Sequence, residues 1–264
     1  MSYKPIEDYG VIGDLHTVAL VSVDGSIDWC CLPHFDSPSV FAAILDDEKG
    51  GYFKITAVSP ERCKQLYLPD TNVLITRFYC ADGIAELIDF MPIEGRSLVY
   101  SPPNYHQIIR RVSTVAGRVR FRLECFPALN YGRDKHDIHP FPQGATFVSP
   151  SASVGLAAPV PLTIEGTGVV AEFSLPRGNT ATFFLRQADR GSEANLLIPE
   201  KTGEMAFRET IDYWKLWMSQ SRYTGRWREM VHRSALVLKL LTYAPSGAIV
   251  AAATTSLPEE IGGV

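Results

Sequence analysis

The sequence has few cysteines, and their spacing does not form a disulfide framework. Its 264 residues contain an odd number of them, without regular spacing: Cys30, Cys31, Cys63, Cys80 and Cys125. No Cys-x-x-Cys pair or cysteine–histidine cluster indicates a zinc site. Free thiols used as small apolar residues fit a reducing compartment, and the opening MSYKPIEDYG has no apolar signal core. We therefore expect a cytoplasmic protein.

Clusters of positive charge and long apolar runs are lacking as well. The net charge is −4, and Lys and Arg do not gather in any run. Nucleic-acid binding needs clustered cations to neutralise phosphates, so a nucleic-acid partner is not expected. The longest apolar runs fall far short of the roughly 20 residues that cross a bilayer. A membrane is not expected as a partner either.

The common catalytic signatures do not occur. There is no GxSxG, no glycine-rich phosphate loop and no HExxH, and His16 and His34 lie in no recognised nucleophile motif. The stretch 130–144 reads as an irregular loop and carries four residues of metal-binding type: Asp134, His136, Asp137 and His139. Because neither a helix nor a strand enforces a ligand spacing there, a solvated loop is favoured. We expect no metal and no cofactor.

What the sequence does contain is a series of short β-runs. Two runs, 18–23 and 27–32, flank Asp24-Gly25, and two more, 72–81 and 84–91, flank Asp82-Gly83. Asp-Gly between β-formers predicts a hairpin with a type I′ turn. Further short runs follow between residues 107 and 187, separated by Gly, Pro and Thr. Many short strands at close spacing predict an antiparallel β-sandwich.

Helical spacing appears at three places. The apolar stretch 39–45 has helical character, and longer helices are predicted over 201–221 and 226–243, with Thr224 as N-cap of the last. Trp214 and Trp227 are expected in the core, whereas Trp217 is left open. One continuous buried face is predicted for the last helix, made of Trp227, Val231, Ser234, Leu238 and Leu241.

Segments near both ends of the sequence together carry a resemblance to a known family. IEDYGVIGD, TVALVSVDGSIDW and LPHFDSPSVFAAIL resemble the N-terminal domain of glucoamylase-like and trehalase-like proteins of glycoside hydrolase family 15. RYTGRWREMVHRSALVLKLLTYAPSGAIVAAATTSLPEEIGG resembles the entry into that family's catalytic (α/α)6 barrel. The resemblance implies a mainly β fold: an antiparallel β-sandwich (a super-β-sandwich) over 1–198, a linker helix over 199–223, and the start of a truncated barrel over 224–264.

The resemblance also implies an enzyme that hydrolyses α-glucosides with inversion at the anomeric carbon. Inverting glycosidases place two carboxyl groups about 6.5–9.5 Å apart, across the scissile bond. Glu259 and Glu260 are neighbours, so they cannot form this pair. In the family, the two catalytic glutamates lie further along the barrel, which implies that this chain holds no catalytic residue. The substrate of the full-length protein is expected to be an α-glucoside or oligosaccharide.

A rim of the active site is the remaining candidate. We expect the loop after the first hairpin to reach the substrate in the complete enzyme, close to the stretch 256–262. Carboxylates, hydroxyls and aromatic faces suit sugars, and the candidate residues are Phe35, Asp36, Ser37, Ser256, Glu259 and Glu260. The alternative is that Asp36 and Ser37 cap the helical stretch at Ser39.

Two other functions remain compatible with the sequence. The chain could serve as a noncatalytic sugar-binding or structural module, or as a sandwich that acts only in assembly. Its C-terminal helices are expected to expose apolar surface, which favours a homo-oligomer.

Overall fold

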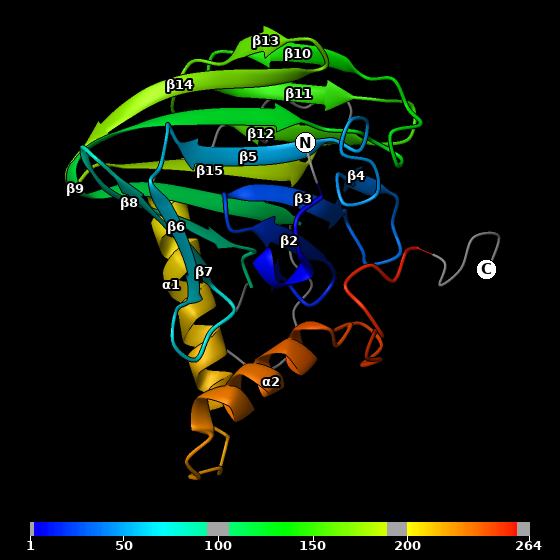
Figure 1. Cartoon of the computed structure of the whole chain (residues 1–264). Helices are drawn as coiled ribbons and strands as arrows, with labels where there is room; N and C mark the ends of the chain where they lie inside the picture. Colours follow the sequence, from blue (N-terminus) through cyan, green and yellow to red (C-terminus); the bar gives the residue numbers. More distant parts are fainter. Residues whose placement is uncertain (1–2, 94–105, 189–199, 258–264) are drawn as a thin grey trace.

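The computed structural model describes residues 3–93, 106–188 and 200–257 (Figure 1). The described chain is mainly β, with two helices near its C-terminal end, which confirms the predicted fold class. The strands are β1 (Tyr9–Gly13), β2 (Val18–Ser22), β3 (Ser26–Cys31), β4 (Ser39–Phe41), β5 (Tyr52–Ala57), β6 (Arg62–Tyr67), β7 (Leu74–Cys80), β8 (Gly83–Phe90), β9 (Gln107–Phe126), β10 (Asp137–Phe141), β11 (Gly144–Val148), β12 (Ser153–Ala157), β13 (Thr163–Glu165), β14 (Gly168–Pro176) and β15 (Thr180–Gln187).

One long strand joins the two layers of the sandwich. The first half of β9 pairs with β8 and β15, whereas its second half pairs with β5 and β14, all antiparallel. Gly117 sits at the change of partners with φ +69°, and a Cβ there would lie 2.0 Å from the carbonyl oxygen of Asp82. Only glycine fits this position without strain. The bend lets one strand belong to both layers (Figure 1).

The main core lies between these layers. Inward-facing aromatic residues from both halves form one buried cluster, including Phe53 of β5, Phe78 of β7, Phe121 of β9 and Phe183 of β15. Their alternation with more exposed residues is the period of two that the sequence shows in its β-runs. Burial of these side chains is the main source of stability in such a fold.

Both predicted hairpins form, but their turns differ from the prediction. In the β2–β3 hairpin only Gly25 has a positive φ, +82°, and its amide donates to Ser22 O at 2.9 Å. A type I′ turn needs two positive φ values, so the predicted turn type is wrong. In the β7–β8 hairpin Cys80 pairs with Gly83, which places the turn at residues 81–82.

The predicted helical character of 39–45 is wrong. Residues Ser39–Phe41 form β4, which pairs with the end of β3 through Cys30 and Cys31. Val40 and Phe41 are buried in the main core. The open edge of β3 supplies backbone partners, so sheet pairing overrides the local preference.

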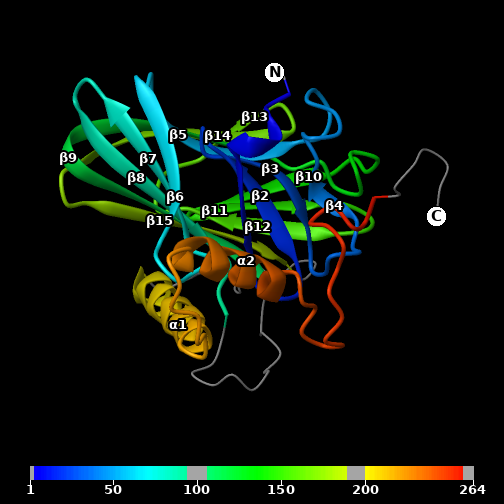
Figure 2. The same ribbon diagram turned by 60° about the horizontal axis from the view of Figure 1, so that its bottom comes forward.

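The two helices lie next to each other at one end of the sandwich (Figure 2). They are α1 (Glu200–Met218), close to the predicted 201–221, and α2 (Arg228–Leu240), which is shorter at both ends than the predicted 226–243. Trp214 is fully buried, as predicted, and Trp217 packs partly against the same cluster. Thr224 does not cap α2: the N-cap position is Trp227, whose side chain makes no capping hydrogen bond.

The predicted buried face of α2 is wrong. His232, Leu236 and Leu240 are its buried residues, whereas Trp227 is 53% exposed and Leu238 is 56% exposed. Both sides of this helix carry apolar residues, so spacing alone could not choose between them. Contacts with the turn between β6 and β7 determine which face of α2 is buried.

Those contacts are polar and specific. The Asn72 amide donates to Leu236 O at 3.1 Å, and Arg233 donates to Thr71 O at 3.0 Å and to the Asn72 side chain. His232 Nδ1 lies 2.8 Å from an Asp70 carboxylate oxygen. These bonds orient the helix on the sandwich.

The expected domain boundary at 198–199 lies outside the described residues. The expected boundary at 223–224 falls between the end of α1 and the start of α2. In the described segments, no helix has the length and apolar character needed to span a membrane.

Candidate functional site

Three histidines gather where four distant segments of the chain meet. The turn between β1 and β2 provides Asp14 and His16, and the loop between β3 and β4 provides His34. His106 stands just before β9, and Tyr243 follows α2. We call these five residues the histidine junction. The four segments are separate in the sequence, so only the fold brings them together.

The β1–β2 turn holds Asp14 in a single position. One carboxylate oxygen of Asp14 accepts the backbone amides of His16 and Thr17, each at 3.0 Å. Leu15 between them has φ +70°, a left-handed conformation that costs energy in a non-glycine residue. The side chain of Asp14 bonds its own following backbone, which is how Asp commonly builds tight turns.

The other carboxylate oxygen of Asp14 faces the imidazoles. It lies 2.8 Å from His106 Nδ1. The ring of His106 is 4.9 Å from the ring of His16 and 5.5 Å from that of His34, measured between centroids. Burial lowers the pKa of His16, more than the neighbouring Asp14 raises it. The junction therefore combines one buried carboxylate with three imidazoles.

The segment after α2 completes the junction. The hydroxyl of Tyr243 lies 3.4 Å from His34 Nδ1, and its ring meets the rings of His16 and His34 edge-on. The amide of Ala244 donates to Leu15 O at 2.9 Å. The start of the C-terminal segment is thereby attached to the β1–β2 turn.

The predicted rim residues fall into three groups: the loop with Phe35, Asp36 and Ser37, then Ser256, and finally Glu259 and Glu260. Phe35 is 4% exposed and packs against the ring of Tyr243, so little of its face is available to a sugar. Asp36 is exposed, and the Ser37 hydroxyl accepts the backbone amide of His34 at 3.1 Å. No helix begins at Ser39, so the capping alternative has no helix to cap.

Ser256 lies beside the last residue of β3, Cys31. Its hydroxyl is 3.4 Å from Cys31 Sγ, and burial raises the pKa of this thiol to about 11. The indole of Trp29 donates to Ala253 O at 3.1 Å, which holds the same C-terminal segment along β3. Glu259 and Glu260 lie outside the described residues.

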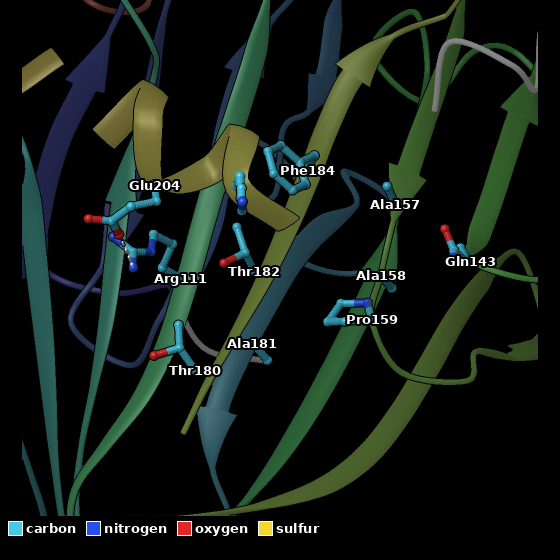
Figure 3. Close-up of a pocket in the computed structure, with 11 residues that line it drawn as sticks. Arg111, Gln143, Ala157, Ala158, Pro159, Thr180, Ala181, Thr182, Phe184 and Glu204 are labelled. Atoms are coloured by element: carbon cyan, nitrogen blue, oxygen red, sulfur yellow. Dashed lines mark ion pairs between the residues drawn. The ribbon is translucent and has the colours of Figure 1, made fainter. Parts of the chain in front are cut away.

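A separate groove runs between α1 and the sheet. It has a volume of about 670 Å³ and is lined in part by Arg111, Thr180, Thr182, Phe184 and Glu204 (Figure 3). Arg111 and Glu204 form an ion pair of 2.8 Å across it. No sequence pattern indicated this groove, because its walls come from β9, β15 and α1.

The predicted loop over 130–144 is partly a strand, since β10 occupies Asp137–Phe141. Asp134 is hydrogen-bonded by the hydroxyls of Ser149 and Ser151, and His136 Nε2 lies 2.8 Å from Thr167 O. These side chains serve local structure. Within the described residues, the side chains of metal-binding type that come within 4.8 Å of one another are instead those of Asp14, His16 and His106.

Sequence reasoning considered His16 and His34 only as nucleophile partners and did not single out Asp14, His106 or Tyr243. His106 stands 92 positions from Asp14, and no local spacing links them. A single sequence contains no signal that could have joined them.

Comparisons with known proteins point to one family. A family model described as "Trehalase-like, N-terminal" matches residues 1–173. A trehalase from Thermoplasma volcanium is 36% identical over 266 residues, covering 99% of this chain and 41% of its own length. A trehalase from Mycobacterium tuberculosis is 30% identical over 292 residues, covering 97% of this chain and 40% of its own length.

The chain thus spans about two fifths of the length of these relatives. Among solved structures, a putative kojibiose phosphorylase from the human microbiome aligns with 78% of this chain and 33% of its own, with a TM-score of 0.35 and 9% identity.

Proposed function

Because this chain belongs to the trehalase-like family through its N-terminal domain, we propose that it is the N-terminal part of an inverting α-glucoside hydrolase. The match to curated trehalases along nearly the whole chain carries this proposal, and it makes trehalose the first substrate to test. The boundaries proposed for its parts are a sandwich over 1–198, a linker helix over 199–223 and the start of a barrel over 224–264.

We further propose that this chain supplies no catalytic carboxylate pair. Glu259 and Glu260 are adjacent in the sequence and cannot stand on opposite sides of a scissile bond. Two other described carboxylates are engaged in ion pairs: Asp89 pairs with Arg110, and Asp24 pairs with Lys4 and Lys54. The chain then contributes the scaffold on which a barrel begins.

Incubation of this chain with trehalose, maltose and isomaltose at high protein concentration tests the proposal. We expect no release of glucose above a blank, because hydrolysis needs both carboxyl groups. Turnover that persists through further purification, and that falls in Glu259→Gln or Glu260→Gln, would contradict it.

Among the described residues, we propose Asp36 and Ser256 as the candidates for the rim of the active site. Glu259 and Glu260 stay candidates outside the described residues. Asp36 is exposed at the end of a rigid hairpin, where a carboxylate can accept hydrogen bonds from sugar hydroxyls. In the full-length enzyme, Asp36→Ala should lower kcat/KM while changing stability by less than about 0.5 kcal/mol. An unchanged kcat/KM would contradict the rim role, and so would a variant that loses stability but keeps its activity.

The alternative function is noncatalytic sugar binding, and the groove of Figure 3 is the observation that favours it. Threonine hydroxyls and the Gln143 amide in its lining can bond sugar hydroxyls. A thermal-shift series with glucose, maltose, trehalose and isomaltose distinguishes this function from a purely structural role. A saturable shift that disappears in Thr182→Val would favour the groove.

Cytoplasmic residence remains part of the proposal. All five cysteines are free, and Cys30, Cys31 and Cys125 are buried, as expected of thiols in a reducing compartment.

A further inference from the structure

We propose that Asp14, His16 and His106 form a binding site for a divalent transition-metal ion of the zinc class. This site is separate from the proposed hydrolytic function and does not depend on it. The three side chains come from the β1–β2 turn and the start of β9, and their ligating atoms lie within 4.8 Å of one another.

Two of the three proposed ligands are separated by nearly the distance that a metal site requires. Zinc bonds to nitrogen and oxygen are about 2.0–2.2 Å long, so tetrahedral ligands lie about 3.3–3.6 Å apart. Asp14 Oδ2 and His106 Nδ1 are 2.8 Å apart, a hydrogen-bond distance. An ion would replace this bond, open the pair by about half an ångström and draw in the ring of His16. A fourth position would remain for water or for the nearby His34.

The charges also favour a cation. The side chains of Asp14 and His16 are only 2% and 5% exposed, and that of His106 is 14% exposed. A buried carboxylate needs a positive partner, and within the described residues its ion-pair partners are both imidazoles. Adding protons to clustered imidazoles brings like charges together, whereas a metal ion supplies the charge and leaves every imidazole neutral.

The surrounding hydrogen bonds hold the ligands in orientation. Asp14 Oδ1 is occupied by two backbone amides, which leaves Oδ2 directed at His106. His16 Nδ1 lies 3.1 Å from Asp14 O, and because a carbonyl oxygen only accepts, this ring nitrogen donates to it. Metal-bound histidines commonly donate their other ring nitrogen to a backbone carbonyl in this way.

The site would link the sandwich to the segment after α2. Ala244 is bonded to Leu15, the residue between two of the ligands, and Tyr243 packs on the ring of His16. An ion bound here would therefore stabilise the attachment of the C-terminal segment as well as the turn.

Titration of the chelator-treated, dialysed chain with Co²⁺ tests the proposal, because tetrahedral Co²⁺ absorbs visibly. We expect one ion per chain, no thiolate-to-metal band, and displacement by Zn²⁺. His16→Gln and His106→Gln should each bind at least about tenfold more weakly. His139→Gln, on the exposed strand β10, is the matched control and should bind like the unchanged chain.

The melting temperature gives a second measurement. Zn²⁺ should raise it in the unchanged chain and in His139→Gln, and leave it unchanged in the two ligand variants. Any one of three results would overturn the site: no visible Co²⁺ spectrum, a spectrum that contains a thiolate-to-metal band, or binding by His106→Gln that equals that of the unchanged chain. The contact between Asp14 and His106 would then be a structural hydrogen bond only. If the ligand variants do not fold, the imidazole NMR signals of the unchanged chain decide: Zn²⁺ must shift those of His16 and His106 before those of His136 and His139.

Discussion

Arg110 lies fully buried inside the sandwich, together with its partner Asp89. Its guanidinium donates to both oxygens of that carboxylate, at 2.8 and 3.2 Å, and to the backbone carbonyls of Phe53 and Gly25. One side chain thus joins β9, β8, β5 and the first hairpin. Loss of one partner from such a pair leaves an uncompensated charge in the interior.

We expect Arg110→Met to lower the free energy of unfolding by about 3–5 kcal/mol, because Asp89 would stay buried without its partner. The matched control is Arg77→Met, which removes an ion pair to Glu86 that is partly exposed on the sheet surface. That change should cost about 0–1 kcal/mol. Urea unfolding followed by circular dichroism measures both, and equal losses would contradict the interpretation of the core.

The helix α2 has apolar residues on two faces, and only one of them is packed. Leu236 and Leu240 are 2% and 0% exposed, whereas Leu238 is 56% exposed. The buried pair packs on Leu15, Val18 and Trp214, beside the histidine junction.

This arrangement predicts that two leucines of one helix differ sharply in their contribution to stability. Leu240→Ala should destabilise the chain by about 2–5 kcal/mol, because it opens a cavity in a packed cluster. Leu238→Ala keeps the same chemistry at an exposed position and should change stability by less than about 0.5 kcal/mol. Thermal or urea unfolding separates the two, and a larger loss at Leu238 would restore the face predicted from the sequence.

The protein as described presents an apolar face at its helical end. Trp227, Met230, Val231 and Leu238 are each between 37% and 66% exposed along α2. Contiguous apolar surface of this kind promotes association, and a second copy of the chain is the partner available in a purified sample.

We therefore expect this chain to associate in a concentration-dependent manner in sedimentation velocity experiments. Replacing Trp227 and Leu238 together by Gln should shift the equilibrium toward monomer, since it removes apolar area at the contact. The exposed Met205 of α1 lies on the other helix, so Met205→Gln serves as the control. A strictly monomeric unchanged chain at high concentration would rule out the homo-oligomer.

Local chemistry was enough to predict the β class, both hairpins and the burial of Trp214. Asp-Gly between β-formers and the alternation of apolar residues act over a few positions, so they can be read without the fold. The family followed from the same segments, because motifs in residues 6–45 stand close together in the sequence.

Tertiary contacts decided the rest, since they involve groups that are distant in sequence. Pairing with β3 turned 39–41 into a strand, and the bonds from Asn72 and Arg233 selected which face of α2 is buried. Asp14 and His106 meet across 92 positions only because β9 begins beside the β1–β2 turn. Sequence periodicity records which residues share a face, but not what that face meets, and the histidine junction depends entirely on that second property.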